Sequence, residues 1–378
     1  MMMADTQNLQ REIAPVEAPV QFDRTQFTPL LVEVDLFLRV SLARESFGVN
    51  GAGLTVAVLD TGLRTTHVDF AGRVPAQRNF TTDNGGKEED ASDGNGHGTN
   101  VGGIIVANGN HRGIAPGANI IPLKVLSNSG GGSFASVDKA LDWVIKNRDR
   151  YNITAVCMSL GDSGNYTDDD DLANDSIRLK IQKLRQAKVA VVVAAGNDFF
   201  NHSSQQGMGY PAIIRETVSV GAVYDANEGA FEYRSGAKAF STGPGQITPF
   251  SQRLHPSLNG RTRTDIFAPG APVTSSGINN DRGESVQHGT SQATPVTAGV
   301  ILLMQQFHLR ETNTLPAVNE LATWLRAGGV VIHDGDDEND NVINTGLDFI
   351  RVDALTALDA VKRHLRKRLF YELMLLVK

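Results

Sequence analysis

The stretch Leu-Thr-Val-Ala-Val-Leu-Asp-Thr-Gly, residues 54–62, is the part of the sequence from which the fold is most readily predicted. Leu54–Leu59 is a short and almost entirely apolar run, which is typical of a strand buried on both faces. Asp60 ends this strand. Functional groups gather beyond the carboxyl ends of strands in parallel sheets, so Asp60 is a candidate for chemistry. A turn or a helix cap explains a single carboxylate in this place equally well.

Outward from this strand, apolar runs and helical patterns alternate along the chain. Further strands are predicted at Ile120–Leu126, Ile153–Leu160 and Val189–Ala195. Helices are predicted at His97–Ala107, Val137–Lys146, Ile177–Ala187, Thr294–Phe307, Leu315–Leu325 and Val352–Leu365. The Gly-rich stretch Tyr224–Gln252 predicts surface loops or a small hairpin. This alternation predicts an α/β fold with a mostly parallel central sheet and helices on both faces.

The predicted elements form a single domain, residues 31–365. Residues 1–30 are polar and contain proline, which is typical of an extension or linker. Residues 366–378 combine a basic cluster with Leu and Met, and we expect a C-terminal tail that packs on the body or on a partner.

Composition limits the classes of function. The chain has 378 residues, of which 40% are hydrophobic and 20% charged, as in soluble globular proteins. Its 42 acidic residues outnumber 35 Lys and Arg, and the net charge of −7 argues against nucleic-acid binding, which needs a basic face. Cys157 is the only cysteine, and the apolar run Thr154–Met158 around it predicts a buried, unreactive thiol.

The first residues, Met-Met-Met-Ala-Asp-Thr-Gln-Asn, lack the basic start and the apolar core of a secretory signal. No run approaches the roughly 18 to 20 apolar residues of a membrane span. We therefore expect a cytoplasmic protein with no membrane partner, although export by a route without a standard signal also fits.

Two further residues have side chains suited to nucleophilic catalysis. His97 lies in Gly-Asn-Gly-His-Gly-Thr, residues 94–99, where glycines let the backbone crowd an imidazole. Ser291 lies in Gly-Thr-Ser-Gln-Ala-Thr-Pro, residues 289–295, at the mouth of a predicted helix whose dipole favours developing negative charge. We expect Pro295 in the first helical turn, where no intrahelical bond is lost. Taken singly, His97 is more often structural and Ser291 an ordinary N-cap.

Asn197 follows the apolar run Val191–Gly196, just past a predicted strand end. Its amide is a suitable donor for an oxyanion, and a simple turn is the alternative. The joint occurrence of these side chains in the chain order Asp, His, Asn and Ser favours catalysis, because subtilisin has its catalytic groups in that order.

The sequence resembles the subtilisin-like serine peptidases, or subtilases. The matching segments are Val56–Gly62, Gly96–Gly103, Gly113–Ala118, Met158–Gly161, Ala194–Asn197, Ala268–Gly270 and Gly289–Pro295. They cover roughly residues 50 to 300, and Thr345–Val361 looks like the closing strand and helix of the family.

This resemblance implies a serine endopeptidase that cuts peptide bonds through an acyl-enzyme. In this implied mechanism His97 removes the proton of Ser291, and Asp60 fixes the orientation of His97. Asn197 and the Ser291 amide hold the oxyanion. No cofactor is required.

The resemblance also implies where substrates, proteins or peptides, bind. Two extended edges clamp the substrate backbone: Gly130, Gly131 and Gly132 on one side, and Ser159, Leu160 and Gly161 on the other. Gly209 matches a small residue at the floor of the first specificity pocket, which leaves room for a large apolar side chain. Cleavage after Phe, Tyr, Leu or Met is therefore expected, although Asp198 is also placed to attract a basic residue.

Departures from the family pattern give three expectations. The loop that forms the family's tight calcium site is short here, at Ala107–Arg112, so that site is not expected even though Asp69 matches one of its ligands. Asp334–Asp340 has oxygen ligands at alternating positions and is either a structural Ca²⁺ site or a solvated acidic loop. Residues 1–30 are too short for a folding pro-domain and are predicted to be an inhibitory extension, as in intracellular members.

Three other functions fit part of the pattern. A transpeptidase or macrocyclase on this fold would use the same residues but pass the acyl group to an amine. A non-catalytic peptide-binding protein would have no need of an intact set of Asp, His, Asn and Ser. An esterase or lipase would carry Gly-x-Ser-x-Gly after a strand with His last in the chain, and the sequence has neither feature.

Overall fold

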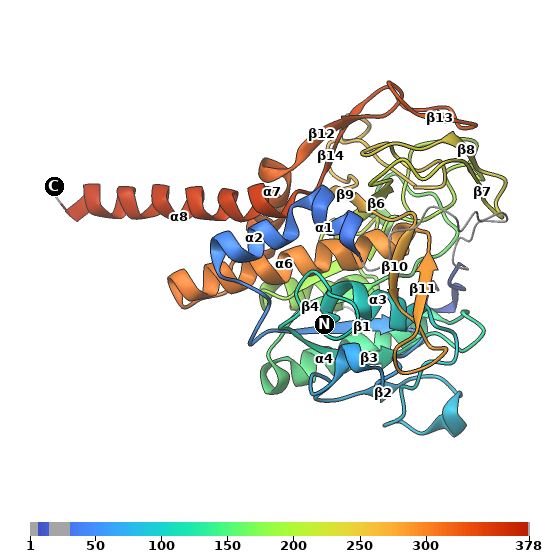
Figure 1. The fold of residues 1–378 in the computed structure, drawn as a ribbon, viewed down its shortest axis with the longest axis horizontal. Helices are drawn as coiled ribbons and strands as arrows, with labels where there is room; N and C mark the ends of the chain where they lie inside the picture. Colours follow the sequence, from blue (N-terminus) through green and yellow to red (C-terminus); the bar gives the residue numbers. More distant parts are fainter. Residues whose placement is uncertain (1–6, 15–30, 377–378) are drawn as a thin grey trace.

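The computed structural model describes residues 7–14 and 31–376, and its centre is a nine-stranded sheet (Figure 1). The strand order is β12-β14-β9-β6-β5-β4-β1-β3-β2. The strands are β1 Thr55–Asp60, β2 Arg78–Asn79, β3 Asn119–Lys124, β4 Ile153–Met158, β5 Ala190–Ala194, β6 Val218–Val223, β9 Ile266–Pro269, β12 Val330–His333 and β14 Asp348–Arg351. All neighbours are parallel except β12 and β14, which confirms the predicted mostly parallel sheet.

Helices cover both faces of the sheet, as predicted. They are α3 His97–Val106 and α6 Thr290–Thr312 on one face, and α4 Phe134–Tyr151 and α5 Ser176–Gln186 on the other. Successive residues of a strand enter different cores, so that Val58 packs on the α3 and α6 side and Leu59 on the α4 and α5 side. Cys157 of β4 is fully buried, and burial raises the pKa of its thiol, in agreement with the predicted unreactive cysteine.

Smaller elements complete the body. They are the helices α1 Val32–Leu38, α2 Val40–Phe47 and α7 Val318–Gly328, the hairpin β10 Val273–Ser276 with β11 Glu284–Gln287, the three-stranded sheet of β7 Phe231–Glu232, β8 Lys238–Ser241 and β13 Asn339–Asp340, and the 3-10 helices η1 Gln7–Gln10, η3 Val68–Phe70, η4 Asn84–Gly86 and η5 Asp170–Leu172. The strands β7 and β8 form the hairpin predicted within Tyr224–Gln252.

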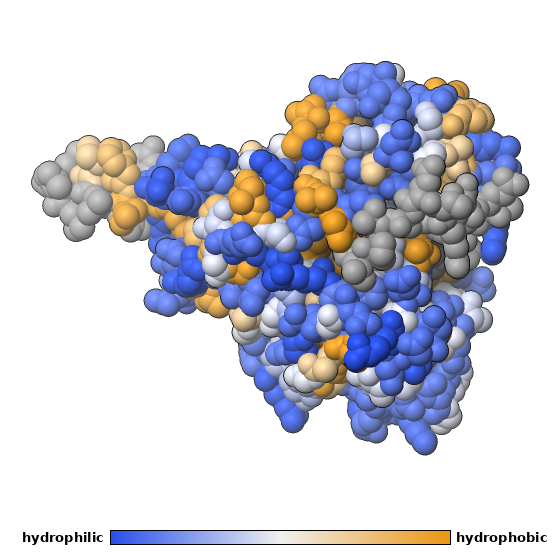
Figure 2. All heavy atoms as spheres, viewed as in Figure 1, coloured by the Kyte–Doolittle hydropathy of each residue, from blue (hydrophilic) through white to orange (hydrophobic). Residues whose placement is uncertain are grey.

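The last helix, α8 Ala354–Leu376, passes residue 365 without a break, so the predicted tail begins inside a helix. Its first part packs on α2, α6 and α7, and its C-terminal part projects from the body (Figure 1). Leu369, Phe370 and Met374 are exposed there, and Figure 2 shows apolar surface near the end of the projection. Within residues 7–14 and 31–376, no helix combines the length and apolar character needed to cross a membrane.

The sheet topology positions the candidate site. After β1 the chain forms β2 and β3 on one side of β1 and then crosses to β4 on the other side. The connections that leave the carboxyl ends of β1 and β4 therefore run to opposite sides. This makes a switch point, where open α/β sheets bind their ligands. Asp60 ends β1 at this point, Ser159 follows β4, and Asn197 comes shortly after β5.

Candidate active site

Asp60 and His97 meet at the carboxyl edge of the sheet, where one ends β1 and the other begins α3. His97 Nδ1 lies 2.7 Å from Asp60 Oδ1, and both side chains are almost fully buried. The Thr61 amide donates to the same oxygen at 2.7 Å. Since a carboxylate only accepts, Nδ1 of His97 carries the proton and Nε2 is the nitrogen that can take another.

Glycines allow this close approach of α3 to β1. A Cβ on Gly98 would lie 2.3 Å from Gly62 O and 3.1 Å from Asp60 Oδ1. Any larger residue at position 98 would therefore push the helix, and with it His97, away from the carboxylate.

Two charged side chains that the sequence did not assign to the site, half-buried Asp93 and buried Lys124, fix its backbone. Asp93 accepts the amide and the hydroxyl of Thr99, at 2.9 and 2.7 Å, and so holds the first turn of the helix that begins at His97. Lys124, at the end of β3, donates from Nζ to Thr61 O at 2.6 Å. The sequence signal for Asp93 is its place four residues before His97, and Lys124 has none beyond a charge at a strand end.

The environment of His97 has opposing effects on its charge. Burial lowers the pKa of His97, because the imidazolium loses its hydration. The charge of Asp60 and its hydrogen bond with His97 raise the pKa by more than burial lowers it, so the pKa of His97 lies above its usual value. The site therefore stabilises the imidazolium that forms when a base takes a proton.

Ser291 lies in the first turn of α6, which begins at Thr290. The expectation for Pro295 is wrong, because it is the sixth helical residue and its missing N–H leaves Ser291 O without the usual helical donor. Ser159 Oγ donates to this oxygen at 2.7 Å. A hydroxyl at the end of β4 thus replaces the lost bond and ties the turn that carries Ser291 to the sheet.

The hydroxyl of Ser291 itself donates to Ser159 O at 3.3 Å. His97 Nε2 is buried and has no hydrogen-bond partner among residues 7–14 and 31–376. The structure thus brings Asp60 and His97 into contact but leaves Ser291 turned to another acceptor. Contacts of this kind are often loose before substrate binds.

Asn197 lies beside the start of α6. Its Oδ1 accepts two hydrogen bonds from Thr290, one from N and one from Oγ1, both at 2.9 Å. Because these bonds occupy the oxygen, Nδ2 is the end of the side chain that serves as a donor. A Cβ on Gly289 would lie 3.4 Å from Nδ2, so the donor adjoins the loop that carries Ser291.

A cleft opens next to these side chains, and both predicted edges border it. Its lining includes Gly130, Ser159, Leu160, Gly161, Asp162, Asn197, Asp198, Thr290 and Ser291. Gly131 lies in a tight turn, where its carbonyl accepts the Ser127 amide at 2.7 Å. Gly209 lies behind the cleft rather than on its surface, with its amide donating to Ala195 O at 2.8 Å. A Cβ on Gly209 would lie 3.1 Å from Asp162 O.

A segment from the N-terminal extension lies between the two edges. Ile13 N–H donates to Gly132 O at 3.3 Å, and Ala14 N–H donates to Gly161 O at 2.7 Å. Ile13 is buried and packs with the core around α4, and both residues line the cleft. The backbone therefore pairs with both edges, as a bound peptide would. The rest of the predicted extension, residues 1–6 and 15–30, lies outside the described residues.

Two groups of side chains in the described parts of the chain have the spacing of a metal site: buried His67, Asp69 and His111, and surface Asp336, Asp337 and Glu338. Asp69 Oδ2 already accepts hydrogen bonds from His111 Nδ1 at 2.7 Å and Ser276 Oγ at 2.6 Å, so its arrangement does not fit a calcium ligand. In the segment Asp334–Asp340, which was predicted as a calcium site, buried Arg253 forms an ion pair with Asp334 at 3.2 Å. Calcium binding by Asp336, Asp337 and Glu338 stays a prediction.

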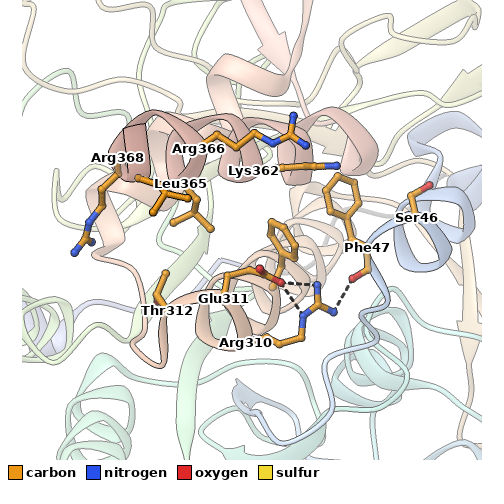
Figure 3. Close-up of a pocket in the computed structure, with 11 residues that line it drawn as sticks. Ser46, Phe47, Arg310, Glu311, Thr312, Lys362, Leu365, Arg366 and Arg368 are labelled. Carbon is orange, nitrogen blue, oxygen red and sulfur yellow. Dashed lines mark hydrogen bonds and ion pairs between the residues drawn. The ribbon is translucent and has the colours of Figure 1, made fainter. Parts of the chain in front are cut away.

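A cavity of about 610 Å³ lies away from this cleft, between α8 and the ends of α2 and α6 (Figure 3). Phe47, Leu365 and Arg310 are among its lining residues, and Arg310 donates to Phe47 O at 2.8 Å. Arg310 and Ser291 are separated by 19 residues of α6, which correspond to about 28 Å of helix. This cavity is therefore not part of the candidate active site.

Comparisons with known proteins agree with this geometry. The model of the subtilase family, peptidase S8, matches residues 51–325. The chain is 30% identical over 264 residues to the major intracellular serine protease of Bacillus subtilis, covering 69% of this chain and 70% of that protein. It is 30% identical over 259 residues to an intracellular serine protease of Paenibacillus polymyxa, covering 68% of each. It is also 33% identical over 297 residues to a thermostable alkaline protease of Halalkalibacterium halodurans, covering 76% of this chain and 68% of that protein. The family match includes β1, α3 and the start of α6, and the chain therefore belongs to the subtilase family of serine endopeptidases.

Proposed function

We propose that this endopeptidase uses Ser291 as nucleophile and His97 as general base. Asp60 holds the His97 tautomer, and Asn197 Nδ2 with the Ser291 amide binds the oxyanion. The observation that carries the proposal is the buried 2.7 Å contact between Asp60 Oδ1 and His97 Nδ1. It prepares a base beside a cleft that Ser291 and Asn197 both line.

The reaction follows from these positions. Ser291 Oγ leaves Ser159 O, passes its proton to His97 Nε2 and attacks the carbonyl carbon of the peptide. Negative charge develops on the carbonyl oxygen, where Asn197 Nδ2 and the N-terminus of α6 stabilise it. His97 returns the proton to the leaving amine as the C–N bond breaks. Water then hydrolyses the acyl-enzyme, with His97 again acting as base.

A peptide library tests both activity and specificity. Because Gly209 adds no side chain behind the cleft, we expect cleavage after Phe, Tyr, Leu and Met, with cut sites mapped by mass spectrometry. If neither the folded protein nor a variant that lacks residues 1–14, whose segment lies in the cleft, cuts any peptide, the proposed function is contradicted. Strict cleavage after Arg or Lys would contradict the specificity alone and would favour a role for Asp198.

The extension also supports a proposal about control. Ile13 and Ala14 use the backbone positions of both edges, so a substrate cannot pair with Gly132 and Gly161 while they are in place. The segment is part of the same chain and acts at high effective concentration, which makes it an inhibitor without tight contacts.

Replacing Ile13 with aspartate should raise kcat/KM on a short peptide by about ten-fold or more. Ile13 is only 6% exposed, and losing the burial of such a side chain costs about 1.5–3 kcal/mol of segment docking. The gain should come mainly from a lower KM, because the segment competes with substrate. Glu12→Gln, at an exposed position of the same segment, serves as control. An unchanged KM in Ile13→Asp and in a deletion of residues 1–14 would contradict inhibition.

For the setting of this activity, we propose protein or peptide substrates in the cytoplasm. Two relatives are named intracellular proteases, and the net charge of −7 disfavours a nucleic-acid partner.

A further inference from the structure

Arg11 makes a contact with the enzyme body that the backbone pairing of its segment does not require. Its Nη1 lies 3.0 Å from Asp162 Oδ2 and also donates to the Tyr166 hydroxyl. The guanidinium carbon lies 5.0 Å from the centre of the Tyr166 ring and 5.4 Å from that of Tyr210. A carboxylate and two aromatic rings therefore surround this one cation.

The side chains that contact Arg11 are held in place by the enzyme body. The Asp162 side chain is 8% exposed, and its Oδ1 accepts the amides of Gly164 at 3.0 Å and Tyr210 at 2.9 Å. These bonds hold the carboxylate in place and leave Oδ2 directed at Arg11 and the Tyr166 hydroxyl. Burial and the charge of Asp162 raise the pKa of Tyr166 to about 12, so this hydroxyl remains a donor.

The chemistry of this group favours arginine over other side chains. A planar guanidinium can bond to a carboxylate while it lies against aromatic rings, whereas an ammonium is more strongly hydrated. A cavity of about 290 Å³ adjoins Arg11, and its lining includes the carboxylates of Asp168 and Asp171. These additional negative charges disfavour an acidic side chain there.

We propose that Asp162, Tyr166 and Tyr210 form an arginine-binding subsite that Arg11 occupies in this structure and that an arginine of the substrate occupies during turnover. This proposal rests on the proposed proteolytic function and names a substrate feature for it. The same subsite thus serves the extension and the substrate in turn, and the two compete for Asp162.

The register of the segment places the substrate arginine. Arg11 lies three residues before Ala14, which pairs with Gly161 in the cleft next to Ser291. If a substrate pairs with the same edge, the cleaved bond lies after the residue equivalent to Ala14 or further along. The preferred arginine therefore precedes the cleaved bond by at least four positions, beyond the pocket that the residue before that bond enters.

The test uses the full chain with Arg11→Ala, which empties the subsite. Quenched peptides with one cleavage site carry Arg, Lys, citrulline or Ala at each position from the fourth to the eighth before the cut. A charge-assisted hydrogen bond predicts about ten-fold higher kcat/KM for Arg than for Ala at one position, with citrulline close to Ala. An equal rate for Arg and Ala at every position would overturn the proposal.

Asp162→Asn in the Arg11→Ala background identifies the group responsible. Asparagine retains the acceptor for the Gly164 and Tyr210 amides, and the readout is the Arg to Ala ratio within each variant, so a general loss of rate cancels. We expect this ratio to fall to about two or less. Asp149→Asn, which removes a carboxylate that is 85% exposed on α4, should keep it. A ratio that survives Asp162→Asn would overturn the subsite.

A binding measurement separates the subsite from the chemistry. Fluorescence anisotropy of labelled Arg and Ala peptides on the Arg11→Ala, Ser291→Ala double variant should show about ten-fold tighter binding of the Arg peptide. If no form of the protein that retains Ser291 cuts a peptide but this difference in binding appears, the proteolytic function fails and the subsite stands. Equal binding of the two peptides refutes the subsite whether or not the enzyme cuts.

Discussion

Ser291→Ala should lower kcat on peptide substrates by about a million-fold, the loss that removal of the nucleophile causes in subtilisin. The reason is local to the first turn of α6. Ser291 is 4% exposed and lies at the positive end of the helix, and its carbonyl is tied to Ser159. A water molecule that replaced the Ser291 hydroxyl would not be held in position to attack the carbonyl carbon. Only oxyanion stabilisation and substrate binding would then remain.

A fluorophosphonate probe and a casein assay together measure this effect. The wild-type protein should form one covalent adduct, which mass spectrometry places on Ser291, and Ser291→Ala should form none. Ser257→Ala, at an exposed serine away from the cleft, is the matched control and should label and turn over normally. The melting temperature should stay close to that of the wild type, since alanine loses one 3.3 Å hydrogen bond to Ser159 O. Residual casein activity above a hundredth of the wild type would contradict this assignment.

Elements with a strong periodic pattern were predicted within a few residues. The strand Leu54–Leu59 is β1 at Thr55–Asp60, because alternate side chains enter two apolar cores and leave no polar face. Since β1 and β5 are neighbours of β4 in one parallel sheet, their carboxyl ends share an edge. This is why a motif at each strand end was enough to predict which side chains gather.

Helix ends were less predictable. α8 continues to Leu376 because residues 366–376 contain good helix formers and neither Gly nor Pro, although this part has little body to pack on. The interpretation of Pro295 was wrong for a different reason. α6 starts at Thr290, and the hydroxyl that compensates the proline belongs to Ser159, which precedes Ser291 by 132 residues. Local sequence does not contain such a partner.

The least predictable part of the site is the segment around Ile13. It binds through backbone amides, which every residue except proline offers, so its pairing with Gly132 and Gly161 leaves no sequence pattern. The contact of Arg11 with Asp162 joins positions 151 residues apart, and in the sequence each of them alone is an ordinary charged residue. Only the fold brings them together.

Asp60→Asn should lower kcat/KM by about ten-thousand-fold while leaving the fold intact. Asp60 Oδ1 accepts hydrogen bonds from both His97 Nδ1 and the Thr61 amide, each at 2.7 Å. An asparagine that keeps the bond to Thr61 presents NH₂ to the imidazole, which favours the tautomer with the proton on Nε2. In that tautomer His97 cannot accept the proton of Ser291.

The pH profile of Asp60→Asn gives the sharper measurement. In the wild type, burial lowers the pKa of His97 and the charge of Asp60 more than reverses this. Neutral His97 is the base, so kcat/KM should fall as the pH drops through this raised pKa. Without the Asp60 carboxylate, burial acts against only the smaller effect of the Asp93 charge, and the acid limb of the profile should move to lower pH. Activated ester substrates would make the remaining rate measurable, and Asp149→Asn, which removes a carboxylate that is 85% exposed on α4, is the control. An acid limb at the same pH in Asp60→Asn and wild type would mean that another group sets the charge of the base.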